Sequence, residues 1–564
     1  MKRIVLAPLL SAVCLLAAPA HAQTPPRAGT EAVKDDGIAV ESALVRSRCG
    51  GCHKADDKGR MTRISYRRAT PENWERTIKR MVSLNHATLT PDDARNILKY
   101  LADHQGLAPE ELRPIAFEEE RRTIEYSYKA DETTANLCSS CHSIARVLSE
   151  RRTKEEWQLL VAMHRGYYPL VDNQPMNGGQ GFMRTRSTRN EPASDDRPAD
   201  NRHPVDRALE HLEKTLPLNT TEWSAWSASM QAPKIAGRWA VMGAQTGKGS
   251  IVGQVTVTAD PSAPDTFTTD IRYTVARTGE TITRSGKALV YTGYQWRGRG
   301  NDWREVLFVE RDWKQMWGRW FTGAYDETGI DVTLTRLGSE PMVLGASVTA
   351  IKTGSTGLHV KIFGANLPGS VRPEDIGLGQ GVKVTRVVSA RPDELSIDVD
   401  VAATAPIGAR DASIGGTVKT AVFVVYDKID GIKVVPQAGM ARVGGAVFPK
   451  QLQQFEAIGI NNGPDGKPDT ADDLNLGLVD VKWSIEEYTA TFGDDDMQWV
   501  GTLDQNGLFT PNVDGPNPKR PGNRNNVGDV WAVAELSGPK PLRARAHLLV
   551  TVPLYMNWFV EESK

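Results

Sequence analysis

Two copies of the pattern C-x-x-C-H constrain this chain more than any other feature: CGGCH at 49–53 and CSSCH at 138–142. In this pattern the two thiols add to the vinyl groups of haem, and the adjacent histidine supplies one axial nitrogen to the iron. A zinc site needs further ligands at close spacing, and a thioredoxin-like redox pair needs a βαβ context, which surrounds neither motif. The sequence therefore predicts two covalently bound c-type haems.

Cysteine usage agrees with this interpretation. The chain has five cysteines, and four of them lie in the two motifs: Cys49, Cys52, Cys138 and Cys141. The fifth, Cys14, lies in an apolar stretch after MKR that ends with AHA at Ala22, which is typical of a cleavable secretory signal. A membrane anchor is the alternative, but the apolar run is short for a span. We therefore expect an exported protein without a transmembrane segment.

Composition limits the partners. The 68 basic and 69 acidic residues give a net charge of −1, so neither nucleic acid nor another polyelectrolyte is implied as a partner. At roughly 100–200 residues per domain, a chain of 564 residues holds three to five domains. We therefore expect a multidomain protein that does not bind nucleic acid.

Each haem motif is followed by a similar amphipathic helix, PENWERTIKRM at 71–81 and KEEWQLLVAMH at 154–164. Aligning Trp74 with Trp157 pairs Met81 with His164. Positions i, i+4 and i+7 share one face of a helix, so each tryptophan and the residue seven places later lie on one apolar stripe. We expect both stripes to face a buried haem. The predicted axial pairs are His53 with Met81 and His142 with His164.

Other distal ligands stay open at this stage. His86 is the alternative for the first haem, and Met163 is the alternative for the second, followed by Met176 and Met183. With the preferred set, both irons would be six-coordinate and would differ in potential, because thioether ligation raises the potential relative to imidazole. Two closed coordination spheres favour electron transport over chemistry at the haems.

The first unit continues to a helix that Thr90 should cap and Pro91 should begin. In the second unit a Gly-, Asn- and Arg-rich loop at 173–203 precedes the matching helix at 204–218. Loops of this length are usually functional or flexible. We consider a lid, a docking loop for a partner, or plain flexibility.

From residue 231 onward, short β-branched and aromatic runs alternate with Gly, Asp and Pro turns. The runs within 231–338 predict an antiparallel β-barrel, and those within 339–427 and 428–564 predict two immunoglobulin-like sandwiches. A tryptophan-rich group in the barrel region could be core or protein interface. Its members are Trp296, Trp303, Trp313, Trp317 and Trp320.

The expected fold class is therefore multidomain α plus all-β. The predicted division is a signal peptide (1–22), two cytochrome c-like haem units (23–106 and 107–230), a barrel (231–338) and two sandwiches (339–427 and 428–564). Within the last domain, the acidic segment 461–473 could hold Ca²⁺, although its spacing is not that of an EF-hand and a solvated loop is the simpler interpretation.

This layout resembles the alpha subunit of quinohemoprotein amine dehydrogenase. The resemblance covers essentially the whole chain and rests on the two haem units, with their WERTIKRM and WQLLVAMH helices, followed by this particular β tail. It implies a heterotrimer with a β-propeller beta subunit and a small gamma subunit that carries cysteine tryptophylquinone. The quinone would oxidise a primary amine, and the two alpha haems would pass electrons to a periplasmic blue copper protein or cytochrome c.

One implication can be tested against the sequence itself. Because all four cysteines outside the signal stretch belong to haem motifs, a cysteine-derived quinone would have to lie on another polypeptide. The alternatives are a stand-alone dihaem electron carrier or haem sensor with partner-binding β modules, and a haem enzyme such as a peroxidase. The peroxidase would need a five-coordinate iron.

Overall fold

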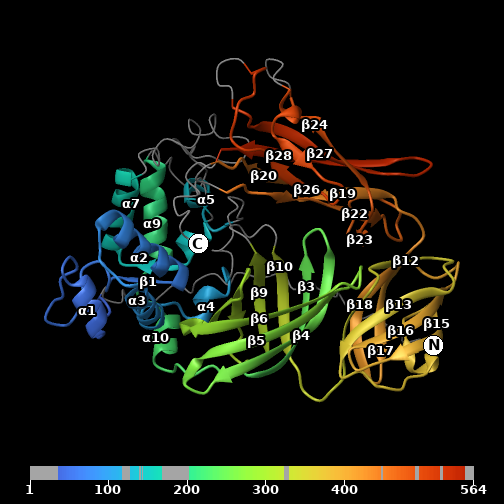
Figure 1. The fold of residues 1–564 in the computed structure, drawn as a ribbon, viewed down its shortest axis with the longest axis horizontal. Helices are drawn as coiled ribbons and strands as arrows, with labels where there is room; N and C mark the ends of the chain where they lie inside the picture. The colour runs from blue at the N-terminus through green and yellow to red at the C-terminus, as the bar shows by residue number, and fades with distance from the viewer. Residues whose placement is uncertain are drawn as a thin grey trace, which may run out of the picture.

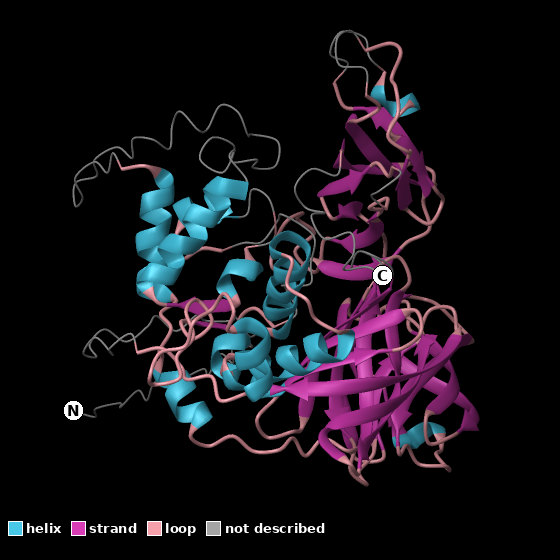
Figure 2. Cartoon of the chain, turned by 60° about the vertical axis from the view of Figure 1, so that its left-hand side comes forward, coloured by secondary structure: helices cyan, strands magenta, loops and turns pink. Residues whose placement is uncertain are grey.

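The computed structural model describes residues 36–116, 128–138, 142, 144–167, 202–322, 329–445, 449–489, 495–520 and 525–552. The predicted signal peptide, Cys141, Met176, Met183 and most of the 173–203 loop lie outside the described residues. The helices gather on the left of Figure 1, and strands make up the remainder (Figures 1 and 2). The predicted fold class, a helical region followed by an antiparallel barrel and further β domains, is confirmed.

The helical region consists of short helices and two three-residue strands. They are α1 (Ala43–Cys49), β1 (Arg67–Ala69), α2 (Pro71–Asn85), α3 (Pro91–His104), α4 (Pro109–Leu112), α5 (Glu132–Cys138), α6 (Ala145–Leu148), β2 (Glu150–Arg152), α7 (Lys154–Tyr167), α9 (Pro204–Thr215) and α10 (Thr221–Ser227).

Local chemistry explains where α3 begins. The Thr90 hydroxyl accepts a hydrogen bond from the Asp93 backbone N–H at 3.1 Å, and the Asp93 carboxylate accepts one from the Thr90 N–H at 3.3 Å. This reciprocal cap satisfies two N–H groups that the helix itself cannot, and Pro91 occupies the first helical position, where no N–H is needed. The predicted start of this helix is confirmed.

The barrel is closed and follows the chain in simple up-and-down order, with the last strand hydrogen-bonded to both its predecessor and the first. Its strands are β3 (Gly237–Gln245), β4 (Gly249–Asp260), β5 (Ala263–Val275), β6 (Thr281–Tyr291), β7 (Gln295–Arg299), β8 (Trp303–Val309), β9 (Gln315–Thr322) and β10 (Ile330–Arg336).

The segment 286–298 alternates like one strand but contains parts of two. A 3₁₀ turn, η3 (Thr292–Tyr294), separates β6 from β7, and the two strands pair antiparallel across it. The turn needs a left-handed backbone at Gly293, where φ is 71°, a conformation that glycine adopts without strain. The alternating pattern continues through the turn and therefore hides it.

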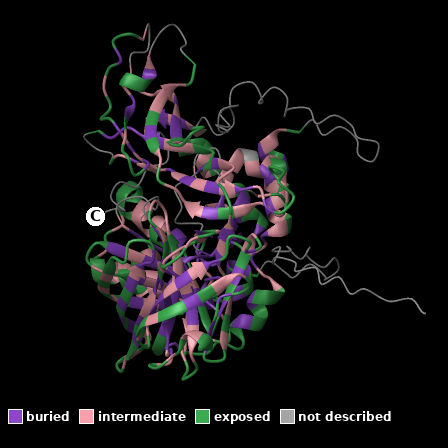
Figure 3. Cartoon of the chain, turned by 90° about the vertical axis from the view of Figure 1, so that its right-hand side faces the viewer, coloured by how far each residue is buried: buried purple, intermediate pink, exposed green. Residues whose placement is uncertain are grey.

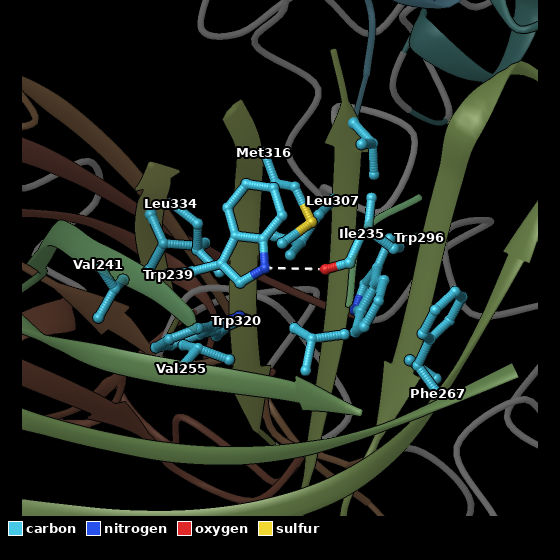
Figure 4. Packing of buried hydrophobic residues seen from close by; sticks show 14 of the residues in the cluster. Ile235, Trp239, Val241, Val255, Phe267, Trp296, Leu307, Met316, Trp320 and Leu334 are labelled. Carbon is cyan, nitrogen blue, oxygen red and sulfur yellow. Dashed lines mark hydrogen bonds between the residues drawn. The ribbon is translucent and has the colours of Figure 1, made fainter. Parts of the chain in front are cut away.

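Three of the five tryptophans are barrel core. Trp296, Trp303 and Trp320 are 1–3% exposed and belong to one interior cluster with Trp239, whose indole N–H donates to the Ile235 carbonyl at 3.0 Å (Figure 4). Along the strands, buried and exposed residues alternate, as Figure 3 shows. The core interpretation is therefore confirmed for these three.

The other two tryptophans lie at the margin of the barrel. Trp313 packs on the rim of the interior cluster. Trp317 instead packs on the outer face against Phe308, at a ring distance of 5.4 Å, beside Leu107 and Leu112 of the helical region. It is an interface residue within the chain.

The first sandwich has two four-stranded sheets, β11-β13-β16-β15 and β12-β18-β17-β14, around one core. Its elements are β11 (Met342–Ala346), β12 (Ala350–Lys352), β13 (Leu358–Ala365), η4 (Pro373–Asp375), β14 (Ile376–Gly377), β15 (Val382–Ala390), β16 (Glu394–Val401), β17 (Gly408–Ile414) and β18 (Thr417–Tyr426).

The last domain has three small sheets, β19-β22-β23, β20-β28-β27-β24 and β21-β26-β25, around a separate core. Its elements are β19 (Gly431–Val435), β20 (Ala438–Arg442), β21 (Gln453–Gln454), β22 (Glu456–Asn461), β23 (Leu474–Leu478), β24 (Lys482–Glu487), η5 (Asp496–Gln498), β25 (Gly501–Leu503), β26 (Leu508–Pro511), β27 (Gly528–Leu536) and β28 (Leu542–Thr551).

A buried carboxyl group lies inside the barrel. Glu305 on β8 is 1% exposed, and the Thr269 hydroxyl donates to its Oε1 at 3.3 Å. Its cross-strand neighbour is Gly298, where an added Cβ would come within 2.5 Å of the same oxygen. Burial raises the pKa of Glu305 to about 8, so this group is largely protonated at neutral pH.

This pKa predicts how barrel stability depends on pH. Between the ordinary pKa of 4.5 and the folded value of about 8, the folded chain keeps a proton that the unfolded chain has released. The free energy of unfolding therefore falls as pH rises through this window. Glu305→Gln should remove the dependence and stabilise the barrel at pH ~8.5 by a few kcal/mol relative to wild type.

Thermal unfolding followed by tryptophan fluorescence at pH ~5.5 and ~8.5 checks this expectation. Asp270→Asn, a change at an exposed carboxylate on the barrel's outer face, is the matched control and should leave the pH profile unchanged. Parallel pH profiles for wild type and Glu305→Gln would contradict the assignment of a neutral buried acid.

Candidate functional site

The first haem motif begins at the last residue of α1. The Cys49 carbonyl accepts backbone N–H groups from Cys52 at 3.3 Å and from His53 at 2.9 Å, so the motif forms a tight turn at the end of the helix. Cys49 is half-buried and Cys52 is exposed, and neither forms a disulfide. The turn keeps the two thiols and the histidine on one short segment, as attachment to a single porphyrin requires.

The imidazole of His53 is held by the backbone. Its Nδ1 lies 2.9 Å from the Thr62 carbonyl oxygen, which can only accept, so Nδ1 carries the proton and Nε2 keeps its lone pair. Burial lowers the pKa of His53, which favours the neutral ring. A neutral imidazole oriented through Nδ1 is the form that binds iron.

Met81 lies on α2, on the same face as Trp74 and half-buried. The Trp74 indole N–H donates to the Gln105 carbonyl at 3.1 Å, which fixes the stripe against the end of α3. The alternative ligand, His86, has a different structural role. It ends α2 in a left-handed conformation with φ of 57°, donates its N–H to the Met81 carbonyl, and is exposed.

The second motif starts in the same way, because Cys138 is the last residue of α5. His142 lies between α5 and α6, and Cys141 lies outside the described residues. Cys138 packs at the edge of a cluster that contains Trp157, Leu160 and Leu209. This cluster places the first thiol of the second motif beside the stripe of α7.

His164 on α7 resembles His53 in its hydrogen bonding. Its Nδ1 lies 2.8 Å from the Leu160 carbonyl oxygen, so Nε2 again keeps its lone pair. Burial lowers the pKa of His164. Met163 is also half-buried. The geometry is compatible with His164 as the axial ligand, although the ligand assignments in both units stay predictions.

The two haem units correspond contact by contact. Trp157 donates its indole N–H to the Leu216 carbonyl at 3.1 Å, as Trp74 does to Gln105. Gln105 and Leu216 follow the last residue of α3 and α9 respectively. These helices also pack alike, α3 against α1 and α2, and α9 against α5 and α7. The units are copies of one structural module.

A strand pair joins the copies. In the antiparallel pair β1–β2, Arg67 faces Arg152, Arg68 faces Arg151, and Ala69 faces Glu150. Because Trp74 corresponds to Trp157, Arg68 corresponds to Arg151 and therefore lies opposite its own counterpart. A local two-fold axis relating the two units passes through this pair.

Glu111 of α4 lies against the central pair. It accepts from Arg68 at 2.7 and 2.9 Å, and its Oε1 lies 3.2 Å from Arg151 Nε. Burial would raise the pKa of Glu111, but Arg151 and Arg68 outweigh that effect and lower it to about 2. One ionised carboxylate thus neutralises part of the like charge at the axis.

Both sockets offer an apolar surface that suits a porphyrin. Leu44, Cys49, Ile78, Leu89 and Leu98 are only partly buried around the first core, and Cys138, Val147, Leu160 and Leu209 are partly buried around the second. These side chains fit a flat apolar group held by the thiols and one imidazole. A haem bound there would supply an iron that accepts and releases single electrons.

Sequence reasoning missed the strand pair and Glu111. A signal was present, since Arg68-x-Thr70-x₃-Trp74 repeats as Arg151-x-Thr153-x₃-Trp157, and both threonines cap their helices. Extending the alignment upstream from the tryptophans would have found it. Aligning Gln105 with Leu216 pairs Glu111 with Glu222, but this match does not show that Glu111 lies against the arginines.

The structure can also be compared with the expectations about metal ions, the acidic segment and membrane spans. In the described part of the chain, no group of three His, Cys, Asp or Glu side chains is arranged to hold a metal ion. In the 461–473 segment, Asp465, Asp472 and Asp473 accept hydrogen bonds from the segment's own backbone and from Thr470. Within the described residues, no helix is long and apolar enough to cross a membrane.

Four domain profiles of one family match the chain in series. They are the haem-binding domain of the quinohemoprotein amine dehydrogenase alpha subunit at 39–186, its domain II at 232–337, its domain III at 340–427 and its domain IV at 432–560. The chain belongs to this family. It therefore has the haem-binding domain of an amine dehydrogenase alpha subunit, and the family implies partner subunits.

Comparison with solved structures adds no functional information. A redesigned β-barrel matches at 18% identity over 18% of this chain and 92% of its own, with a TM-score of 0.15. A de novo designed fluorescence-activating β-barrel matches at 16% identity over 19% of this chain and 100% of its own, with a TM-score of 0.16. Human protocadherin-24 EC1-2 matches at 13% identity over 38% and 97%, with a TM-score of 0.15. No curated protein matches.

Substitution of the distal residues tests the ligand assignments. Met81→Ala should abolish the thioether-to-iron absorption, and His164→Ala should abolish the bis-imidazole signal, because each removes one axial bond. His86→Ala and Met163→Ala are the matched controls, and both should keep the wild-type spectra. A spectral change in either control, with unchanged spectra in its partner variant, would transfer the ligand role to the control residue.

Proposed function

We propose that this chain is the dihaem electron-transfer subunit of a periplasmic quinohemoprotein amine dehydrogenase. The observation that carries the proposal is the duplicated module. Each copy has a C-x-x-C-H motif that starts at a helix end. Each also has a helix with an apolar stripe that ends in the Met81 thioether or the His164 imidazole. The family membership supports haem binding, and the duplication supports two haems rather than one.

The coordination chemistry supports a carrier role. With His53 and Met81 on one iron and His142 and His164 on the other, neither iron keeps an open position for a substrate. A thioether-ligated and a bis-imidazole iron differ in potential, which suits the stepwise passage of single electrons. Amine oxidation would then take place on another chain.

The cysteine count supports the same division of labour. All four cysteines outside the signal-like stretch belong to haem motifs, which supports a cysteine-derived quinone on another chain. By the resemblance to the family, we assign cysteine tryptophylquinone to a small gamma subunit that assembles with a β-propeller beta subunit. Electrons from the quinone would enter one alpha haem and leave through the other to a blue copper protein or a cytochrome c. The N-terminal apolar stretch before Ala22 supports export to the periplasm.

Purification from the native periplasm tests this function. A small co-purifying chain should stain for quinone redox cycling, and a primary amine should reduce the haems of the complex. The haems should stay six-coordinate, so carbon monoxide should not bind to the reduced protein. The proposal would be contradicted if no small chain co-purifies and a primary amine does not reduce the haems. Carbon monoxide binding would favour a haem enzyme such as a peroxidase.

A further inference from the structure

A continuous set of contacts links the two haem stripes through the strand pair. The Arg67 guanidinium lies over the Trp74 ring at 4.7 Å and donates to Glu150 Oε1 at 2.5 Å. The Arg152 Nε donates to Glu150 Oε2 at 2.6 Å, and its guanidinium lies over the Trp157 ring at 5.7 Å. We refer to Arg67, Glu150 and Arg152 as the Glu150 bridge.

The bridge is well shielded from solvent. Arg67, Glu150 and Arg152 are 5%, 7% and 4% exposed, so their charges act through protein rather than water. The Arg67 guanidinium also donates to the Thr77 hydroxyl at 2.5 Å and to the Asn73 carbonyl at 3.2 Å, both on α2. One carboxylate from the second unit therefore holds an arginine of each unit.

The bridge lies at the tryptophan end of both stripes. Trp74 precedes Met81 by seven residues and Trp157 precedes His164 by seven, which is about 10 Å along a helix. On the second unit, Arg152 pairs with Glu150 and lies over Trp157, at the start of the stripe that ends at His164. Glu150 is therefore connected to the second stripe through Arg152 and to the first stripe through Arg67.

The sign of the effect follows from the charges. Reduction adds one negative charge to a haem iron, so nearby positive charge favours the reduced state and nearby negative charge opposes it. Two guanidiniums and one carboxylate leave the bridge with a net charge of +1. Glu150 opposes reduction, Arg152 favours it, and screening by salt is weak at buried sites.

We propose that Glu150 is a shared electrostatic control point for the two haems and lowers the potential of both. The inference rests on the proposed function, because it takes His164 as an axial ligand. It assigns to the strand pair a role in setting the electron distribution between the haems, beyond holding the units together.

Glu111 provides a matched control. Like Glu150, it is a buried carboxylate that two arginines of the strand pair contact, and the loss of its charge disturbs the same β1–β2 pair. Its partner Arg68 stacks on Trp223 at 4.7 Å instead of on a tryptophan of a haem stripe. Removal of Glu111 should therefore perturb the fold in a comparable way with a smaller effect on the haems.

The test is a redox titration of the purified full complex at pH ~7, following each haem by its own spectrum. Glu150→Gln should raise the equilibrium constant for reduction of the bis-imidazole haem on the order of tenfold, which is the effect that one charge has over about 10 Å at an effective dielectric constant of about 20. The shift of the other haem should have the same sign. Arg152→Gln should shift both haems in the opposite direction.

The controls separate structure from electrostatics. Glu111→Gln should lower the unfolding temperature to a similar extent while shifting the bis-imidazole haem by less than Glu150→Gln does. Equal shifts in the two glutamate variants, or the same sign for Glu150→Gln and Arg152→Gln, would overturn the inference. If Glu150→Gln does not fold, Arg152→Gln still tests the sign. If the wild-type complex shows no bis-imidazole spectrum, that result would instead count against the proposed function.

Discussion

The helical region depends on the burial of like charges at the junction of its two halves. Arg67, Arg68, Arg151 and Arg152 are each at most 7% exposed on a pair of three-residue strands. Removing a guanidinium from water costs several kcal/mol, and this cost is offset only where carboxylates are placed with good geometry. Glu111 and Glu150 meet that need, one on each side of the pair. Neither haem unit can therefore keep its arginines buried without the other, and the two units form one body.

The remainder of the molecule attaches to this body through mixed contacts. The barrel contacts the helices through ion pairs, Arg297 with Glu72, Lys99 with Asp265, Arg113 with Glu310, and Arg311 with Glu110. It also packs Phe308 and Trp317 against Leu107 and Leu112 of the helical region. The first sandwich packs on the barrel through Ala240, Val252, Leu344 and Phe363, which form an apolar cluster. The exposed ion pairs of the helix–barrel contact should be the part most sensitive to salt.

Local sequence patterns predicted much of the fold. Thr90 with Pro91 predicted a helix start, the alternating runs predicted the barrel strands, and the two tryptophan-led stripes were placed on the correct helices because period and capping are local properties. The strand pair was not predictable in this way. Strands of three residues are too short to show an alternating pattern, and β1 and β2 are 83 positions apart. Glu111 is recognised only when α4 is seen to lie against Arg68 and Arg151, since its ordinary surroundings in the sequence resemble any exposed acidic turn.

The position of Glu111 has a consequence for how a chain of this kind arises. A two-fold axis through an arginine and its counterpart is the geometry of a symmetric homodimer of single-haem units, in which each residue meets its own copy. Such a dimer would face two like charges at the axis, and symmetry would require any carboxylate to be contributed twice or not at all. Glu111 and Glu222 are counterparts, since aligning Gln105 with Leu216 pairs them, but Glu111 is buried against both arginines whereas Glu222 is exposed. In a single polypeptide the two acids can differ, so the contacts at the axis need not be symmetric.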